Sequence, residues 1–218
     1  MLRIDLYTEI SCPWCIIGQY RLDKVLRDRF PDLAVDIRHH PVLLLPDTPA
    51  DGLYIPDLLR SRYGVTDPKV AFARPEAEAR ASGLDLDLSR QPYSYPTQAA
   101  HALIQAAEKY GTQHKIAVAI TEAYFLEAKN IGNADVLADI AVTCGFERDT
   151  AVAIARDPTW RKVVEREAAN SVAAGVRSVP HFNFGGRIEI NGGRSEDEIA
   201  SAISEAIRVT ADNQSANR

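Results

Sequence analysis

The chain has 218 residues, of which 46% are hydrophobic and 25% are charged, and its formal net charge is −5 at pH 7. These values are typical of a globular protein with a substantial core, built as one large domain or as a domain that carries an insertion. The negative charge argues against nucleic-acid binding, and no apolar run reaches the roughly eighteen residues that a membrane span requires.

The N-terminal region predicts a β-α-β unit. Polar and apolar residues alternate over residues 2–7, which indicates a strand, and residues 13–30 have the periodicity of a helix. Residues 34–40 alternate again and are followed by Pro41, which indicates a second strand. Two strands connected by one helix favour a parallel pair with a right-handed crossover.

The middle of the chain predicts a large helical insertion over residues 46–174. Its composition is rich in alanine, and glycine residues separate the helical segments. Residues 84–96 are the stretch that we expect to be irregular. We expect helices at residues 53–63, 67–82, 97–110, 114–128, 134–144, 149–155 and 157–174.

Strands return after the helices. Residues 181–184 and 187–190 flank Gly185-Gly186, a pattern that is typical of a β-hairpin. Ser195 and Glu198 have the spacing of a capping box, which predicts the start of a final helix with an apolar stripe.

Cys12 and Cys15 are the residues that most directly indicate a chemistry. They lie three positions apart where the first strand meets the first helix, which is a C-x-x-C redox pattern. Pro13 suits the first helical turn, and cysteines one turn apart have the roughly 5–6 Å between α-carbons that a disulfide needs. Cys12 lies at the positive end of the helix dipole, which favours a nucleophilic thiolate. We therefore expect Cys12 to attack a disulfide and the more buried Cys15 to resolve the mixed disulfide.

Two other interpretations of the pair are disfavoured. A C-x-x-C pair can provide half of a zinc site, but the sequence has no second C-x-x-C and no pair of histidines at ligand spacing. The pair can also be an inert part of the core. Because the redox interpretation is stronger than both, we expect no metal.

The third cysteine and three of the histidines are weaker candidates for function. Cys144 shares an apolar helical stripe, so we expect a buried side chain and not a third redox thiol. His39 and His40 are consecutive in a strand and therefore point to opposite faces, and a structural role is favoured for them. His101 is expected to pack against the part of the protein that contains the strands.

The chain resembles the DsbA-like branch of the thioredoxin superfamily, close to the FrnE-type oxidoreductases. The combination of C-P-W-C-x-x-G with a late V-P is specific, and the resemblance extends from about residue 2 to residue 207. It is carried by Ser11-Cys12-Pro13-Trp14-Cys15-Ile16-Ile17-Gly18, Ala99-Ala100-His101-Ala102-Leu103, Ala173-Ala174-Gly175-Val176 and Val179-Pro180-His181-Phe182.

The resemblance implies an α/β, thioredoxin-like fold (β-α-β … β-β-α) that is interrupted by a large all-helical insertion domain. The thioredoxin-like domain would comprise residues 1–45 and 175–210, and the insertion residues 46–174. Residues 211–218 would be a flexible polar tail.

The resemblance also implies thiol–disulfide exchange, with Cys12 as the nucleophile and Cys15 as the resolving thiol. Pro180 would be a cis-proline beside them, and Val179 would lend backbone groups to the bound substrate. No cofactor is needed beyond the two thiols, although glutathione is a candidate redox partner. The substrates would be proteins or small molecules that contain a disulfide or a thiol, and an oligomer is compatible with the sequence.

Three residues beside these are candidates for shaping the site. Trp14 lies between the cysteines and is expected to shape the exposed rim. Glu9 is a candidate proton shuttle for Cys15, against the alternative of a solvated charge. His181 follows the proline, where an imidazole would stabilise the Cys12 thiolate, although a structural role is favoured.

The expected location is the cytoplasm. No signal peptide precedes the first strand, and three cysteines in a chain of this length agree with a reducing compartment.

The chain departs from the usual family pattern at several positions. Glu9-Ile10-Ser11 stands where an aspartate is usual, and Ile16-Ile17-Gly18 follows the motif where Tyr-Ile-Gly is common. Ser178 replaces the glycine of Gly-Val-Pro, and His181 replaces a small polar residue. These differences leave the partner and the redox potential open.

Two alternative functions remain. Kappa-class glutathione transferases and hydroxychromene-carboxylate isomerases resemble the same insertion architecture, but they use a serine near the first-cysteine position and lack the second cysteine. Ser11 adjoins the site here, while both cysteines are present. The other alternative is a binding or chaperone module in which the helical lid presents a groove.

Overall fold

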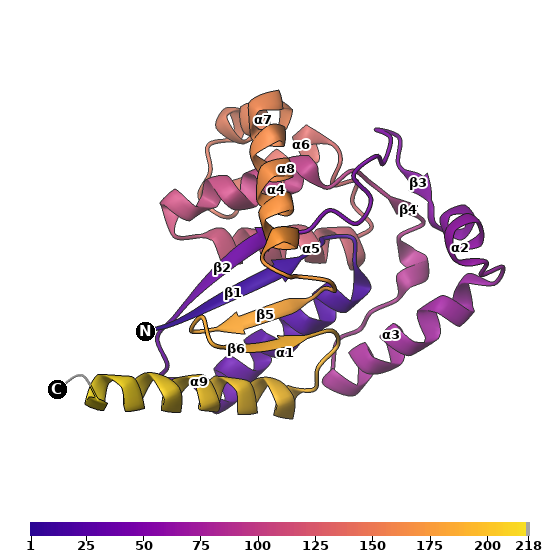
Figure 1. Cartoon of the computed structure of the whole chain (residues 1–218). Helices are drawn as coiled ribbons and strands as arrows, with labels where there is room; N and C mark the ends of the chain where they lie inside the picture. Colours follow the sequence, from indigo (N-terminus) through magenta and orange to yellow (C-terminus); the bar gives the residue numbers. More distant parts are fainter. Residues whose placement is uncertain (217–218) are drawn as a thin grey trace.

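The computed structural model describes residues 1–216 and contains a four-stranded sheet with the order β2-β1-β5-β6 (Figure 1). The strands are β1 (Leu2–Thr8), β2 (Val35–Pro41), β5 (His181–Phe184) and β6 (Ile188–Asn191). β1 and β2 are parallel, as predicted, whereas β5 is antiparallel to both β1 and β6. The hairpin prediction is confirmed, because Gly185 and Gly186 connect its strands with φ angles of 64° and 72°.

One face of the sheet is apolar and packs against α1 (Pro13–Arg29) and α9 (Glu196–Ala216). The two-residue period of a strand brings Ile4 and Leu6 to this face, where they pair in register with Phe184 and Phe182 of β5. The helices complete this core with Leu22, Val25, Ile199 and Ile203.

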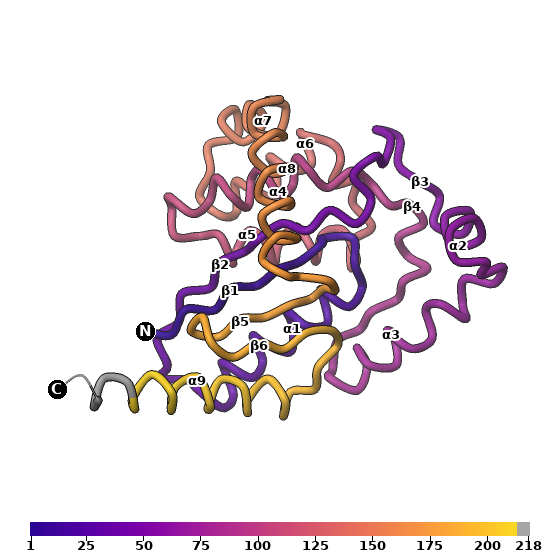
Figure 2. The backbone as a smooth tube through the Cα atoms, viewed as in Figure 1, coloured from indigo at the N-terminus to yellow at the C-terminus, as the bar shows by residue number. Residues whose placement is uncertain are grey.

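The chain leaves the sheet after β2, passes through a set of helices and returns to β5 through α8 (Figure 2). The buried apolar side chains of this insertion form a second core, which also contains Ile16 and Ile17 of α1. The predicted helical insertion is therefore confirmed, while its limits at residues 46 and 174 stay a prediction. Its helices are α2 (Ile55–Tyr63), α3 (Pro68–Ser82), α4 (Gln98–Ala106), α5 (Gln113–Phe125), α6 (Ala134–Val142), α7 (Arg148–Arg156) and α8 (Pro158–Ala173), with 3₁₀ turns at Leu88–Arg90 and Ala107–Tyr110.

A small second sheet differs from the sequence prediction. β3 (Leu53–Tyr54) pairs with β4 (Tyr93–Ser94), where we expected the start of a helix and an irregular segment. Local periodicity cannot reveal a pairing between segments forty residues apart. Pro56 in the first turn suits the start of α2 at Ile55, because proline has no amide to leave unpaired there.

The final helix begins as predicted but extends further. Ser195 N donates to Glu198 Oε2 at 2.8 Å and Glu198 N donates to Ser195 Oγ at 3.2 Å, which confirms the capping box. α9 continues to Ala216, so residues 211–216 are helical where we expected a flexible tail. Residues 217–218 lie outside the described residues. Within residues 1–216, no helix combines the length and apolar character needed to cross a membrane.

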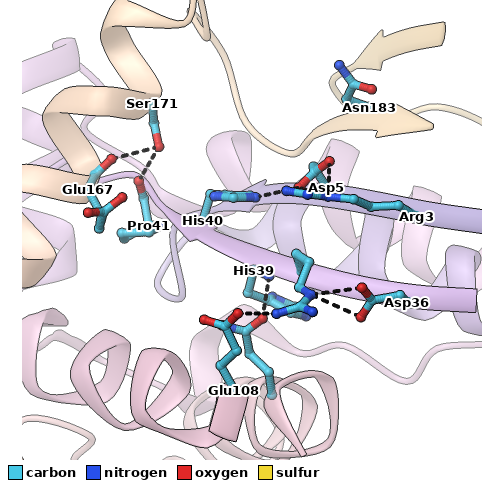
Figure 3. Close-up of polar contacts among 12 residues, drawn as sticks. Arg3, Asp5, Asp36, His39, His40, Pro41, Glu108, Glu167, Ser171 and Asn183 are labelled. Carbon is cyan, nitrogen blue, oxygen red and sulfur yellow. Dashed lines mark hydrogen bonds and ion pairs between the residues drawn. The ribbon is translucent and has the colours of Figure 1, made fainter. Parts of the chain in front are cut away.

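The opposite face of the sheet is polar (Figure 3). Asp5 is buried there, accepts a hydrogen bond from Arg3 Nη2 at 2.7 Å and lies 2.7 Å from His40 Nε2. The His40 ring stacks on Tyr7 with ring centroids 4.5 Å apart. Ser171 Oγ of α8 donates to the carbonyl oxygen of Pro41 at 2.9 Å, which joins the insertion to the end of β2.

A buried arginine of α1 connects three parts of the fold. Arg21 donates to Ser82 Oγ at 2.7 Å and to Glu78 Oε2 at 2.7 Å, both on α3. It also donates to the carbonyl oxygens of Arg194 at 2.9 Å and Gly193 at 3.4 Å. This role could not be predicted from the sequence, because arginines on helices are usually solvated.

Replacing Arg21 by methionine should lower the free energy of unfolding by about 2–3 kcal/mol, because buried carbonyl and hydroxyl oxygens would lose their donors. Arg27→Met is the matched control on the same helix, since Arg27 is exposed and its side chain bonds to the adjacent Asp28. We expect that control to stay within about 0.5 kcal/mol of the natural protein in urea unfolding. Equal losses for both variants would contradict the connecting role of Arg21.

His39 is a second buried polar residue, and it points to the face opposite His40, as predicted. Its Nε2 lies 2.9 Å from His114 Nδ1, and His114 Nε2 lies 2.7 Å from Asp23 Oδ1. Burial, together with the charges of neighbouring histidines, lowers the pKa of His39 well below its ordinary value. His39 is therefore neutral in the folded protein at neutral pH.

Stability should fall as the pH drops below about 6.5, because the unfolded chain then binds a proton at His39 that the folded protein excludes. The limiting slope for one such residue is about 1.4 kcal/mol per pH unit. Denaturant unfolding at a series of pH values should show a shallower dependence for His39→Gln than for the natural protein. Identical slopes would show that His39 does not carry this effect.

Candidate active site

The two cysteines lie at the start of α1, next to the end of β1. Cys12 is the N-cap residue of the helix, with φ −88° and ψ 120°, and Pro13 occupies the first turn. The amide nitrogen of Cys15 donates to the carbonyl oxygen of Cys12 at 2.9 Å. Cys12 is half-buried and Cys15 is 2% exposed, and both are free thiols. Of the two cysteines, Cys12 is the one that is partly exposed.

The pKa values of the two thiols move in opposite directions. A hydrogen bond from the Cys15 side chain, helped by the backbone amides of Cys15 and Trp14, lowers the pKa of Cys12. Burial, followed by the interaction with Cys12, raises the pKa of Cys15 well above its ordinary value. Cys12 is therefore the more acidic of the two thiols, and the buried Cys15 stays protonated at neutral pH.

Trp14 is held between two parts of the chain that are distant in sequence. The guanidinium carbon of Arg74, on α3, lies 5.4 Å from the centroid of its ring. A Cβ atom added to Gly193 would lie 2.4 Å from Trp14 Cε3, so only glycine allows this approach. Trp14 is packed as well as placed at the rim, which the motif alone did not indicate.

Pro180 packs directly against α1 at Gly18, three residues after Cys15. The Val179–Pro180 peptide bond is cis, and the carbonyl oxygen of Pro180 accepts a hydrogen bond from Gly192 N at 2.8 Å. A Cβ atom on Gly18 would lie 2.7 Å from Pro180 Cγ, so the glycine of C-P-W-C-x-x-G provides the space for the proline. Pro180 is buried and Val179 is half-buried.

His181 lies on the polar face of the sheet, opposite the apolar face that packs against α1. Its ring contacts Tyr7 edge-on at 5.4 Å, and its Nε2 lies 3.8 Å from Glu189 Oε2. His181 is also absent from the leading contributions to the pKa of Cys12. This placement gives no support to the hypothesis that its imidazole stabilises the thiolate.

Glu9 is buried behind the cysteines and is not a solvated charge. It is 1% exposed, and its Oε2 accepts a hydrogen bond from Leu44 N at 3.0 Å. Its Oε1 lies 3.6 Å from Nε2 of His101, which is equally buried. The expected packing of His101 against the strand-containing part is thereby confirmed. The charge of Glu9 tends to raise the pKa of both Cys12 and Cys15, so it opposes thiolate formation.

A cavity of about 280 Å³ opens beside Cys12. Ser11, Pro13 and Trp14 contribute to its wall next to Cys12, and the helices α2 and α3 of the insertion provide much of the remainder. Sequence reasoning missed this cavity. Its only local signal is the apolar clustering in residues 55–75, which is equally compatible with an ordinary core.

The other candidates identified from the sequence lie apart from this arrangement. Cys144 is buried in the core of the insertion, as predicted. His40 is bonded to Asp5 on the polar sheet face, and His39 to His114. Among residues 1–216, no group of three or more His, Cys, Asp or Glu side chains is arranged to hold a metal ion.

Known proteins match the chain over nearly its whole length. The family model described as DSBA-like thioredoxin domain matches residues 3–204. An uncharacterised protein of Bacillus subtilis is 24% identical over 212 residues, which cover 94% of this chain and 96% of that protein.

Solved structures share the fold. A probable DsbA oxidoreductase from Streptomyces coelicolor has a TM-score of 0.83 and 21% identity, with 94% of this chain and 90% of that chain covered. A 2-hydroxychromene-2-carboxylate isomerase has a TM-score of 0.72 and 15% identity, covering 96% and 98%. The cytosolic disulfide reductase DsbM from Pseudomonas aeruginosa has a TM-score of 0.64 and 16% identity, covering 95% and 99%. Because the family model matches residues 3–204 of the 218, the chain belongs to the DsbA-like thioredoxin domain family.

Proposed function

We propose that the protein is a thiol–disulfide oxidoreductase that uses Cys12 and Cys15 as its redox pair. The observation that carries this proposal is the asymmetry of the two sulfurs at the start of α1. Cys12 is accessible and its pKa is lowered, whereas Cys15 is buried one turn away and its pKa is raised. An attacking thiol must be reachable and ionisable, whereas a resolving thiol can stay buried and protonated until the mixed disulfide has formed.

The reaction would have two exchange steps. The Cys12 thiolate attacks one sulfur of the substrate disulfide, which forms a mixed disulfide and releases the other half as a thiolate that takes up a proton. Cys15 then loses its proton and attacks Cys12, which releases the second half and leaves a Cys12–Cys15 disulfide. The substrate gains two electrons and the protein loses two, so an external thiol such as glutathione must reduce the protein again.

The proposal also includes the substrates, the redox partner and the cellular location. Substrates would be proteins or small molecules with a disulfide or a thiol, and no cofactor other than the thiols is required. Glutathione is proposed as a redox partner, and the related fold of DsbM has been solved with GSH. A cytoplasmic location and a role for Pro180 and Val179 in contacting substrate are part of the same proposal.

A glutathione-dependent isomerase or transferase is the second candidate. The observation that favours it is Ser11, which lines the same cavity as Cys12. In that case the hydroxyl group of Ser11, and not Cys15, would support bound glutathione.

Cys12→Ser should abolish reduction of insulin disulfides, because the attacking thiolate is lost. Cys15→Ser should instead accumulate a mixed disulfide with substrate, visible as a mass increase that dithiothreitol reverses. Cys144→Ser is the matched control and should retain full activity, since Cys144 is buried in the insertion core. Full activity in Cys12→Ser would refute the proposal.

The pKa of Cys12 should rise in Cys15→Ala, because the leading cause of its lowering is the hydrogen bond from the Cys15 side chain. Cys15→Ser keeps a donor at this position and should shift the pKa less. Thiolate ultraviolet absorbance across a pH titration measures both. Indistinguishable titrations for the two variants would show that the hydrogen bond does not set the acidity of Cys12.

The two candidate functions differ in their dependence on Cys15. Catalytic turnover of disulfide exchange should be lost in Cys15→Ala. Glutathione conjugation or isomerisation activity should instead persist in Cys15→Ala and fall in Ser11→Ala. Conjugating activity that survives Cys15→Ala, together with absent disulfide reductase activity in the natural protein, would favour the second candidate.

A further inference from the structure

The cavity beside Cys12 has an apolar wall. α2 contributes Leu58 and Leu59, and α3 contributes Ala71 and Phe72. Among the described residues that line it, none is a Lys, Arg, His, Asp or Glu, so the only ionisable groups in the lining are the Cys12 thiol and tyrosine hydroxyls. A bound group would therefore lose its contact with water without gaining an ion pair, which is costly for any charged substituent.

Two buried polar side chains in the lining, Gln91 and Tyr124, are already hydrogen-bonded within the protein. Gln91 Nε2 donates to the carbonyl oxygens of Tyr124 at 3.2 Å and Lys129 at 3.3 Å, and Gln91 Oε1 accepts from Tyr93 N at 3.2 Å. The Tyr124 hydroxyl donates to the carbonyl oxygen of Tyr93 at 3.0 Å. Because these polar groups already bond within the protein, this part of the cavity should bind a group through its shape and through apolar contacts.

Trp14 gives the cavity a rigid wall on the side of the cysteines. Its ring contacts the Arg74 guanidinium and lies close to the Gly193 backbone. Arg21 in turn holds the carbonyl oxygen of Gly193 and the α3 residues Glu78 and Ser82. Because both supports of Trp14 are tied to α1, the wall should keep its position when a substrate enters.

We infer that this cavity binds the apolar, uncharged substituent of a small-molecule disulfide, whose reacting sulfur is thereby presented to Cys12. The inference rests on the proposed function and narrows its substrate class. A volume of about 280 Å³ is close to the lower end of the range for small-ligand pockets, so an aryl or short branched alkyl group suits it. The Cys12 sulfur in the wall identifies the occupant as a group attached to the sulfur that is attacked.

With such a substrate, the reaction follows the same two exchange steps. The Cys12 thiolate bonds to the sulfur that carries the buried substituent, and the sulfur–sulfur bond of the substrate breaks. The outer half leaves as a thiolate toward solvent and is protonated there. Attack by Cys15 on Cys12 then releases the buried half as a second thiol and forms the protein disulfide, which dithiothreitol reduces in the assay.

The test compares two aromatic disulfides that differ in charge. Dithiodipyridine is uncharged at neutral pH, whereas dithiobis-nitrobenzoate carries a carboxylate on each ring. The rate of each with reduced protein is divided by its rate with a simple model thiol, which removes the intrinsic reactivity. We expect this ratio to be about tenfold higher for the uncharged reagent, the effect of burying one apolar group.

Ala71→Leu and Ala73→Leu provide the matched variants. Both make the same change on α3, but Ala71 lines the cavity and Ala73 is exposed outside it. Ala71→Leu should remove most of the preference for the uncharged reagent while the rate with dithiobis-nitrobenzoate is retained. Ala73→Leu should leave both rates unchanged.

The outcomes separate this inference from the proposed function. Equal normalised rates for the two reagents, or a preference that survives in Ala71→Leu, would overturn the apolar site and leave disulfide exchange standing. Failure of Cys12 to form the Cys12–Cys15 disulfide with either reagent would overturn the proposed function itself.

Discussion

The position of α1 between two hydrophobic cores is the constraint on which the site depends. Ile16 and Ile17 pack into the core of the insertion, while Leu22 and Val25 pack against the sheet. Because protein interiors are close-packed, the helix cannot tilt without opening one of these cores. Cys12 begins this helix, so the position of its sulfur and the direction of the helix amides are set together.

The electrostatics of the cysteines combine opposing effects. Short-range hydrogen bonds from Cys15 and the helix amides favour the Cys12 thiolate, whereas partial burial and the charge of Glu9 oppose it. Glu9 is kept in this position by the hydrogen bond from Leu44 N. The arrangement limits the acidity of Cys12, and a thiolate whose pKa is less depressed is intrinsically more nucleophilic.

The chemistry and the surroundings of the site come from different parts of the chain. The sheet-containing part supplies the cysteines and Pro180, while the insertion supplies much of the wall of the adjacent cavity. Arg21 joins these parts, because it bonds to α3 and to residues 193–194. A change in the insertion can therefore alter which substituent fits without moving a reacting sulfur, in keeping with the reuse of one fold for several functions.

Sequence patterns alone predicted the fold class, the β-α-β start, the closing hairpin and the capping box, and they identified the C-x-x-C motif. These features depend on local periodicity, turn glycines and a short motif, all of which act between residues close in the chain. Other features emerged only in the folded structure, namely the β3–β4 pairing, the burial of Glu9 and Arg21, the contact of the His181 ring with Tyr7, and the cavity. Each of these depends on contacts between segments tens of residues apart, and such contacts exist only after the helices have packed against the sheet.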